Sequence, residues 1–75
     1  MKVFQIKLSL TKDTKDFVRI TARQPFDIDL QSGRYIVDAK SIMGIFSLDL
    51  TKPVQVTIHS DDCDELLKEL EVYKV

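Results

Sequence analysis

The sequence predicts an α+β fold of the open-faced sandwich type, in which a four-stranded antiparallel sheet carries three helices on one face. Three observations lead to this fold class. In four segments, apolar residues alternate with polar ones, as in strands that bury one face. Three other segments carry apolar residues at helical spacing. The chain has 75 residues, which is enough for one domain, 1–75, with a thin core.

The first half of the chain predicts a strand, a helix and a hairpin. Apolar residues alternate over 4–10, which favours the first strand. A polar stretch follows, in which Asp13 or Thr14 can cap a helix that ends before Pro25. A second strand over 26–31 and a third over 34–40 flank Ser32-Gly33, a typical tight turn.

The second half predicts a short helix, a fourth strand and a last helix. Residues 41–48 are mostly apolar and begin with Ser41, a good helix N-cap. Residues 54–58 alternate again, and Asp61-Asp62 places acidic residues in the first turn of a last helix. The predicted order is therefore β-α-β-β-α-β-α. The apolar stripe expected on the last helix consists of Cys63, Leu66, Leu67, Leu70 and Tyr73.

Composition excludes several classes of function. Eleven basic and twelve acidic residues leave a net charge of −1, so no bulk attraction to nucleic acid is expected. A single cysteine, Cys63, and a single histidine, His59, can form neither an internal disulfide nor an ordinary metal cluster. We expect no metal and no cofactor. The chain lacks a signal-peptide pattern and a long apolar run, so we expect a cytoplasmic protein.

One segment resembles a known family. Lys40-Ser41-Ile42-Met43-Gly44, with its flanks from Val37 to Leu48, is similar to the regulatory-serine region of HPr, the phosphocarrier of the bacterial sugar phosphotransferase system. The predicted order of elements is also the HPr order. The resemblance extends over nearly the whole chain, and it implies the HPr-like version of the open-faced sandwich.

Ser41 has two compatible interpretations. From the residues alone, it caps the short helix, a role worth about 1 kcal/mol. The resemblance implies in addition that Ser41 is the residue that HPr kinase/phosphorylase modifies in carbon catabolite regulation. A phosphate there adds roughly −1.5 to −2 charge beside Lys40, which changes a binding surface without refolding the domain.

The phosphocarrier signature is where the sequence departs from the family. Relatives carry Gly-hydrophobic-His-Ala-Arg-Pro at the start of the first helix, and the histidine accepts a phosphoryl group from enzyme I. Anchoring the alignment on Thr21-Ala22 puts Thr11 in place of that histidine and Asp13 in place of the arginine. A threonine is a poor acceptor without a general base, and an aspartate repels phosphate. We therefore expect a protein without carrier chemistry, not an enzyme, similar in this respect to the HPr homologue Crh.

The short helix also supplies the expected docking surface. A short helix cannot bury every apolar side chain, so some of them reach solvent. Core filling is the alternative, and it suits Ile45 and Leu48 best. The partners that the resemblance implies are HPr kinase/phosphorylase, phosphotransferase-system components or a transcription regulator, and neither nucleic acid nor membrane. The partner-binding residues are expected to be Lys40, Ile42, Met43 and Phe46.

Three functions remain open from the sequence. The first is a regulatory module switched by phosphorylation of Ser41. The second is an unphosphorylated interaction domain unrelated to sugar transport. The third is a residual phosphocarrier that uses His59 or Thr11. Strand parity places His59 on the open face of the sheet without an orienting partner, and Asp27 and Asp29 on the same solvated face.

Overall fold

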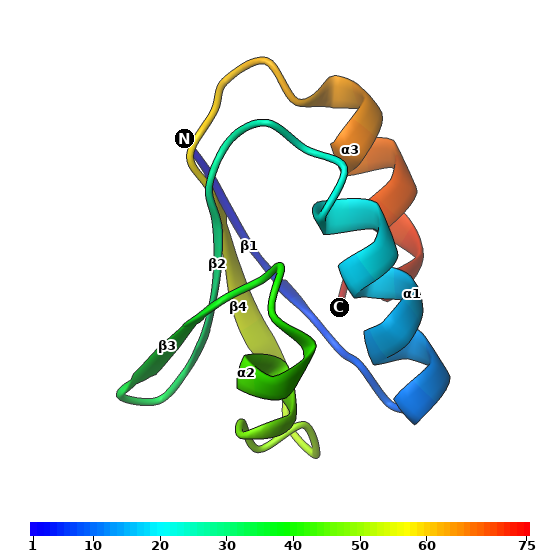
Figure 1. Ribbon diagram of the computed structural model, residues 1–75, viewed down its shortest axis with the longest axis vertical. Coiled ribbons are helices and arrows are strands. Elements are labelled where there is room, and N and C mark those ends of the chain that lie inside the picture. Colours follow the sequence, from blue (N-terminus) through cyan, green and yellow to red (C-terminus); the bar gives the residue numbers. More distant parts are fainter.

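The computed structural model describes residues 1–75 and contains one four-stranded sheet with three α-helices (Figure 1). Helices α1 and α3 lie side by side against one face of the sheet, and α2 lies beside the β3 end of it. None of the helices has the length and apolar character that crossing a bilayer requires. The elements are β1 (Lys2–Ile6), α1 (Thr11–Thr21), β2 (Ile28–Ser32), β3 (Tyr35–Asp38), α2 (Ile42–Phe46), β4 (Val54–Ile58), α3 (Asp64–Leu70) and the 3-10 turn η1 (Glu71–Tyr73).

The sheet has the strand order β1-β4-β2-β3, and every neighbouring pair is antiparallel. The predicted fold class and element order are therefore confirmed. Alternate residues of each strand face the helices, and the others form an open face. In β4 this alternation is complete, because Val54, Val56 and Ile58 are buried while Gln55 and Thr57 are half-exposed.

The core lies between the inner face of the sheet and the three helices. Fourteen apolar residues are buried in one cluster, and Phe17 of α1 is the largest fully buried one. Burial of each such aliphatic or aromatic side chain contributes about 1.5–3 kcal/mol, which is why a helix as short as α2 persists. The cluster consists of Ile6, Leu8, Phe17, Ile28, Leu30, Ala39, Ile45, Leu48, Val54, Val56, Ile58, Cys63, Leu66 and Leu70.

The two edges of the sheet differ. The edge of β1 is covered by the C-terminal segment, because Lys7 N–H donates to the Tyr73 carbonyl and Val75 N–H donates to the Gln5 carbonyl. The Lys74 ammonium adds a contact 4.9 Å from the centre of the Phe4 ring. The edge of β3 carries no such cover and projects from the molecule as a hairpin (Figure 1).

The structure corrects the predicted start of the first helix. β1 ends at Ile6 rather than at residue 10, and α1 begins at Thr11 rather than after a cap at Asp13 or Thr14. Leu10 is the N-cap residue, and the Asp13 carboxylate reaches back to accept the Leu10 N–H at 3.1 Å. A carboxylate at the third helical position satisfies a free N–H and suits the helix dipole, so it starts the helix earlier.

The two strands of the hairpin are shorter than predicted. β2 starts at Ile28 and β3 ends at Asp38, because the two strands pair only from Asp29 opposite Asp38 to Ser32 opposite Tyr35. Gly33 turns the chain between them with a positive φ of 59°, a conformation that favours glycine.

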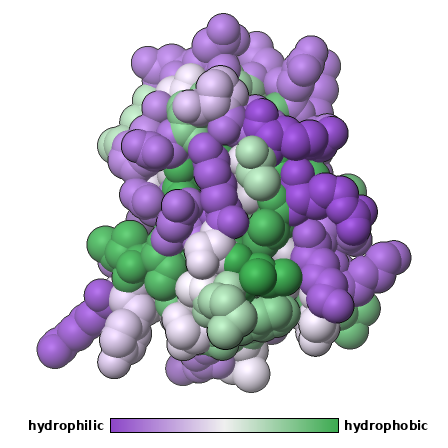
Figure 2. Space-filling view, viewed as in Figure 1, coloured by the Kyte–Doolittle hydropathy of each residue, from purple (hydrophilic) through white to green (hydrophobic).

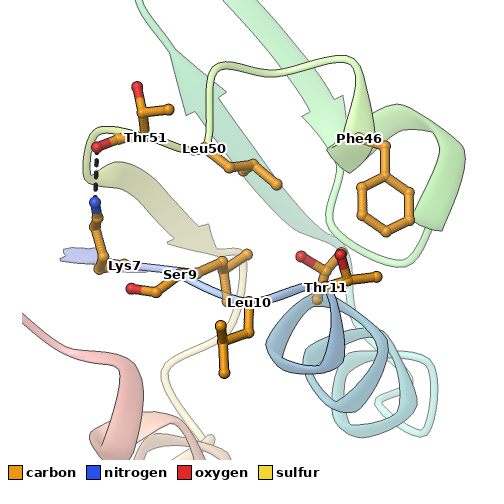
Figure 3. Close-up of a pocket in the computed structure, with 9 residues that line it drawn as sticks. Lys7, Ser9, Leu10, Thr11, Phe46, Leu50 and Thr51 are labelled. Atoms are coloured by element: carbon orange, nitrogen blue, oxygen red, sulfur yellow. Dashed lines mark hydrogen bonds between the residues drawn. The ribbon is translucent and has the colours of Figure 1, made fainter.

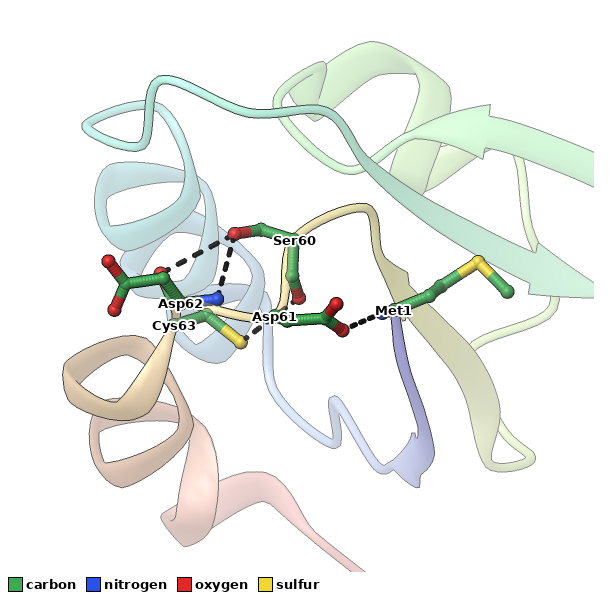
Figure 4. Close-up of polar contacts among 5 residues, drawn as sticks. All are labelled: Met1, Ser60, Asp61, Asp62 and Cys63. Atoms are coloured by element: carbon green, nitrogen blue, oxygen red, sulfur yellow. Dashed lines mark hydrogen bonds and ion pairs between the residues drawn. The ribbon is translucent and has the colours of Figure 1, made fainter.

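Helix α3 begins at Asp64 rather than at Asp61-Asp62, because residues 60–62 form a turn (Figure 4). The Ser60 hydroxyl accepts the Asp62 N–H at 3.1 Å, and the Cys63 thiol lies 3.5 Å from the Ser60 carbonyl. Asp61 pairs instead with the amino group of Met1, which lowers the pKa of this carboxyl below its usual value. The sequence pattern of acidic residues did not reveal this turn.

Candidate functional site

The largest cavity opens between the β1–α1 junction and the α2–β4 connection (Figure 3). It has a volume of about 470 Å³. The ring of Phe46 and the side chain of Leu50 line one side, and the start of α1 with Thr11 lines the other. The nine lining residues are Lys7, Leu8, Ser9, Leu10, Thr11, Thr14, Phe46, Leu50 and Thr51.

The polar groups of this cavity are hydroxyls and one ammonium. Thr11 and Ser9 are exposed, whereas Thr14 is fully buried and its hydroxyl has no hydrogen-bond partner. The carboxylate nearest to Thr11 in the sequence, on Asp13, accepts the Leu10 N–H. No imidazole lines the cavity, so Thr11 has no general base beside it.

The ammonium of Lys7 supports the far wall of the cavity. Its Nζ donates to the Thr51 carbonyl at 2.7 Å. The same loop is closed by Asp49, which accepts hydrogen bonds from the hydroxyl and the N–H of Thr51. These bonds, with smaller contributions from the Lys52 and Lys7 charges, hold the pKa of the Asp49 carboxyl below its usual value. Lys7 therefore fixes the loop position and contributes positive charge to the cavity.

Ser41 lies at the start of α2, as the sequence predicts. Its Oγ accepts the Gly44 N–H at 3.2 Å, and its side chain is exposed. Lys40 is half-buried, and its ammonium donates to the Gln24 carbonyl at 2.8 Å, just beyond the end of α1. The charge of Lys40 thus lies between α1 and α2 and has one of its three donors occupied.

Exposed apolar side chains flank the cavity. Leu10, Met43 and Phe46 are 63%, 78% and 43% exposed, and we refer to these three residues as the docking patch. Met43 and Phe46 are three residues apart on α2 and so share a helix face, while Leu10 and Phe46 line the same cavity. In the space-filling view, apolar residues gather in the lower half of the molecule, where α2 lies, and hydrophilic ones cover the upper half (Figure 2).

The other apolar residues of this region lie as expected or are more buried. Ile45 is fully buried and Leu48 is 7% exposed, which confirms that they fill the core. Ile42 is half-buried, so it contributes less surface than Met43 or Phe46. Leu10 was missed by the sequence interpretation because the alternation up to residue 10 assigned it to a strand. Its position as N-cap of α1 is what exposes it.

His59 differs from its prediction. Its Nε2 lies 2.8 Å from Oδ2 of Asp29, so the ring does have an orienting partner. Asp29 belongs to β2, which neighbours β4 in the sheet, and this strand order could not be derived from the sequence alone. Both residues lie on the open face as expected, about 40% exposed, next to Asp27 and Asp38. This second cavity is acidic, and it shares no lining residue with the first one.

Comparison with known proteins identifies relatives of the whole fold. Residues 11–73 match the sequence model of the family described as PTS-HPr, the HPr component phosphorylation site of the phosphotransferase system. No curated protein sequence matches significantly. The crystal structure of HPr-C-His from Thermoanaerobacter tengcongensis is similar with a TM-score of 0.80 and 28% identity, over 96% of this chain and 89% of that one.

A second solved structure gives the same result. The phosphocarrier protein HPr from Bacillus anthracis strain Ames is similar with a TM-score of 0.74 and 28% identity, over 99% of this chain and 96% of that one. The similarity of fold therefore extends over nearly the full length of this chain.

Proposed function

This chain belongs to the HPr family of the phosphotransferase system, and on that premise we propose that it is a regulatory binding module that has lost the phospho-accepting histidine. Proteins of this family carry phosphoryl groups rather than catalyse a reaction of their own, and they interact with other phosphotransferase-system proteins. We further propose that it binds such partners in the cytoplasm and takes part in carbon catabolite regulation, as a Crh-like protein does.

The observation that carries the proposal is the chemistry at the start of α1. The family match begins at Thr11, the residue that we align with the histidine. No imidazole lines the cavity beside the hydroxyl of Thr11, and the Asp13 carboxylate is engaged through Oδ2 with the Leu10 N–H. Negative charge on Asp13 also opposes an incoming phosphoryl group. These contacts support loss of carrier chemistry with the scaffold intact.

The docking patch supports the binding role. Leu10 and Phe46 face the same cavity from two different elements, and Met43 extends this apolar surface along α2. Apolar side chains that converge on one place are what a protein partner buries as anchors. We propose that a partner docks on this patch, with half-buried Ile42 and the Lys40 charge at its border.

Ser41 supplies the proposed switch. Its exposed hydroxyl lies at the first turn of the helix that carries Met43 and Phe46. A phosphate at this position adds roughly −1.5 to −2 charge at the border of an apolar surface. The Gly44 N–H now donates to the Ser41 Oγ at 3.2 Å. After phosphorylation it can donate to a phosphate oxygen instead, so α2 keeps its N-cap. The expected result is a changed partner preference on an unchanged fold.

The switch is tested by incubation with HPr kinase/phosphorylase and ATP, followed by mapping of the phosphate by peptide mass spectrometry. We expect modification of wild type and none of Ser41→Ala. The matched control is Ser47→Ala at the other end of α2, where the exposed Ser47 hydroxyl donates to the Gly44 carbonyl. Phosphate on Ser47 or on no residue would contradict the switch and leave the plain interaction domain.

The docking role is tested by calorimetric titration with phosphotransferase-system partners. Met43→Asp should weaken binding at least ten-fold, because it places a charge on the most exposed side chain of the docking patch. Val72→Asp is the control, since Val72 is 81% exposed but lies in η1, outside the patch. Equal losses for the two variants would contradict docking at this patch.

A residual carrier at His59 is a second candidate. The bond to Asp29 orients the ring and leaves Nδ1 free, which favours it. The surrounding carboxylates of Asp27 and Asp38 disfavour it, because they repel a phosphoryl donor. Incubation with enzyme I and phosphoenolpyruvate distinguishes a residual carrier from the regulatory binding module. A phosphoryl group found on His59 of wild type and absent from His59→Ala would establish the carrier.

A further inference from the structure

The open edge of β3 is unlike the other edge of the sheet. The C-terminal segment covers β1, while β3 presents a four-residue strand with Tyr35 74% and Ile36 62% exposed. Unpaired strand edges template pairing with another strand, and natural proteins normally cover them or protect them with charge. Ile36 is an apolar residue in the middle of this edge, so the edge is suited to pairing.

The backbone groups that face outward can be assigned from one hydrogen bond. Ala39 N–H donates to the Ile28 carbonyl at 2.9 Å, so the main chain of Ala39 faces β2. Main-chain groups alternate in direction along an antiparallel strand. Val37 and Tyr35 therefore face β2 as well, and the N–H and C=O of Ile36 point to the free edge. An incoming strand can form a pair of hydrogen bonds with Ile36.

From these contacts we propose that β3 pairs with β3 of a second copy of this chain, antiparallel and with the two-fold axis at Ile36. The two sheets then form one continuous eight-stranded sheet. This interaction uses the main-chain edge of β3 rather than the cavity that Leu10 and Phe46 line, so it does not rest on the proposed regulatory function.

Charge complementarity selects this register. Arg34 is the turn residue that directly precedes β3. With Ile36 opposite Ile36 of the second copy, strand alternation continued by one residue into the turn brings Arg34 of each chain opposite Asp38 of the other, on the same face of the sheet. Arg34 forms no ion pair within the monomer, and Asp38 uses one carboxylate oxygen to accept the Lys40 N–H at 2.9 Å. The paired edges thus form two Arg34–Asp38 pairs, one on each side of the central contact between the two Ile36 side chains.

The neighbouring registers are less favourable. A shift by two residues toward the C-terminus places Arg34 opposite Lys40, which opposes two positive charges. A shift in the other direction places Asp38 opposite Ser32, beyond the turn at Gly33, where the chain no longer follows the edge. A shift by one residue opposes outward-facing Ile36 with Val37, whose main chain is bonded to β2.

The pairing should be weak, because a four-residue edge buries far less than the 1,200–2,000 Å² of a standard interface. We expect a dissociation constant on the order of 0.1 to 1 mM. Sedimentation equilibrium and concentration-dependent amide shifts of the full chain measure it. The shifts should be largest at Ile36, and its amide should gain protection from hydrogen exchange as the concentration rises.

A charge-reversal pair tests the register. Arg34→Asp alone opposes four carboxylates, and Asp38→Lys alone opposes four cations, so each variant should associate at least ten-fold more weakly than wild type. An equimolar mixture restores both opposite-charge pairs and should dimerise about as well as wild type. Circular dichroism checks the fold of Asp38→Lys, which loses the bond to the Lys40 N–H.

Two further variants keep the test decisive. Ile36→Lys puts two ammonium groups on the axis and should abolish association. The control Val3→Lys alters an exposed residue of β1 on the opposite edge and should change nothing. The proposal would be overturned if the protein stayed monomeric at all concentrations up to several millimolar. It would also be overturned if Val3→Lys weakened association as much as Ile36→Lys does. Failure of the mixture to recover would overturn the register.

Discussion

Replacement of Thr14 by valine should stabilise the protein, whereas the same replacement at Thr21 should destabilise it. Both threonines belong to α1 and both are fully buried. Their hydroxyls differ. The Thr14 hydroxyl has no hydrogen-bond partner, while the Thr21 hydroxyl donates to the Ala39 carbonyl at 2.8 Å and contacts the Val18 carbonyl.

The expected magnitudes follow from this difference. A buried hydroxyl without a partner costs about 1–3 kcal/mol, and Thr14→Val removes that cost while keeping the shape of the side chain. At Thr21 the exchange removes a bond and leaves the Ala39 carbonyl unpaired, a loss of about 1–2 kcal/mol. Valine and threonine have similar helix propensities, so the helix itself contributes little to either result.

Urea and thermal denaturation followed by far-ultraviolet circular dichroism measure both variants, since the chain has no tryptophan. For a domain of this size, 1 kcal/mol corresponds to a shift in Tm of roughly 4–8 °C. Thr14→Val should raise Tm and Thr21→Val should lower it. A similar decrease for both variants would refute the reasoning, because it would mean that the Thr14 hydroxyl is paired in solution.

Three other predictions concern the helix start, the hairpin turn and one ionisable side chain. Asp13→Ala removes the acceptor of the Leu10 N–H and should cost about 1 kcal/mol in urea denaturation; an unchanged midpoint would contradict the assigned cap. Gly33→Ala should cost about 1 kcal/mol because of its positive φ, and Gly33→Asn less, since asparagine tolerates this conformation; equal costs would argue against the turn. Burial, together with two carboxylates of α1, raises the pKa of Tyr73 above its ordinary value of 10.0. The stability that Tyr73 contributes is then complete below pH 10.0 and is lost as pH rises through the folded pKa. Ultraviolet titration of Tyr35→Phe, which leaves Tyr73 as the one tyrosine, should show a midpoint above 10.0, and a midpoint at or below 10.0 would contradict burial of this phenol.

The sequence predicts the fold well because most of its elements bury one face. Val54, Val56 and Ile58 alternate without exception, and the strand assigned to them has the observed bounds. Where burial is not the deciding force, the prediction is less accurate. The start of α1 depends on one reach-back bond from Asp13, and the start of α3 on the turn at Ser60. Such local hydrogen bonds leave little trace in hydrophobic periodicity.

The features of the candidate site also differ in how far the sequence predicts them. Ser41 as N-cap and the exposure of Met43 follow from local pattern and from the small size of α2. The meeting of Leu10 with Phe46, and of His59 with Asp29, depends on contacts between elements distant in the sequence. The first contact requires α1 to pack beside α2 and the second requires β4 to lie beside β2, and hydrophobic periodicity specifies neither.

The central claim, that the HPr scaffold persists here without its phosphoryl acceptor, is tested most directly by intact mass after incubation with enzyme I and phosphoenolpyruvate. An HPr that carries the histidine serves as the positive control in the same tube, and Thr11→His restores an imidazole at the start of α1. We predict that the control gains one phosphoryl group and wild type gains none. An acid-labile phosphoryl group on wild type that passes to a sugar permease domain would contradict the account.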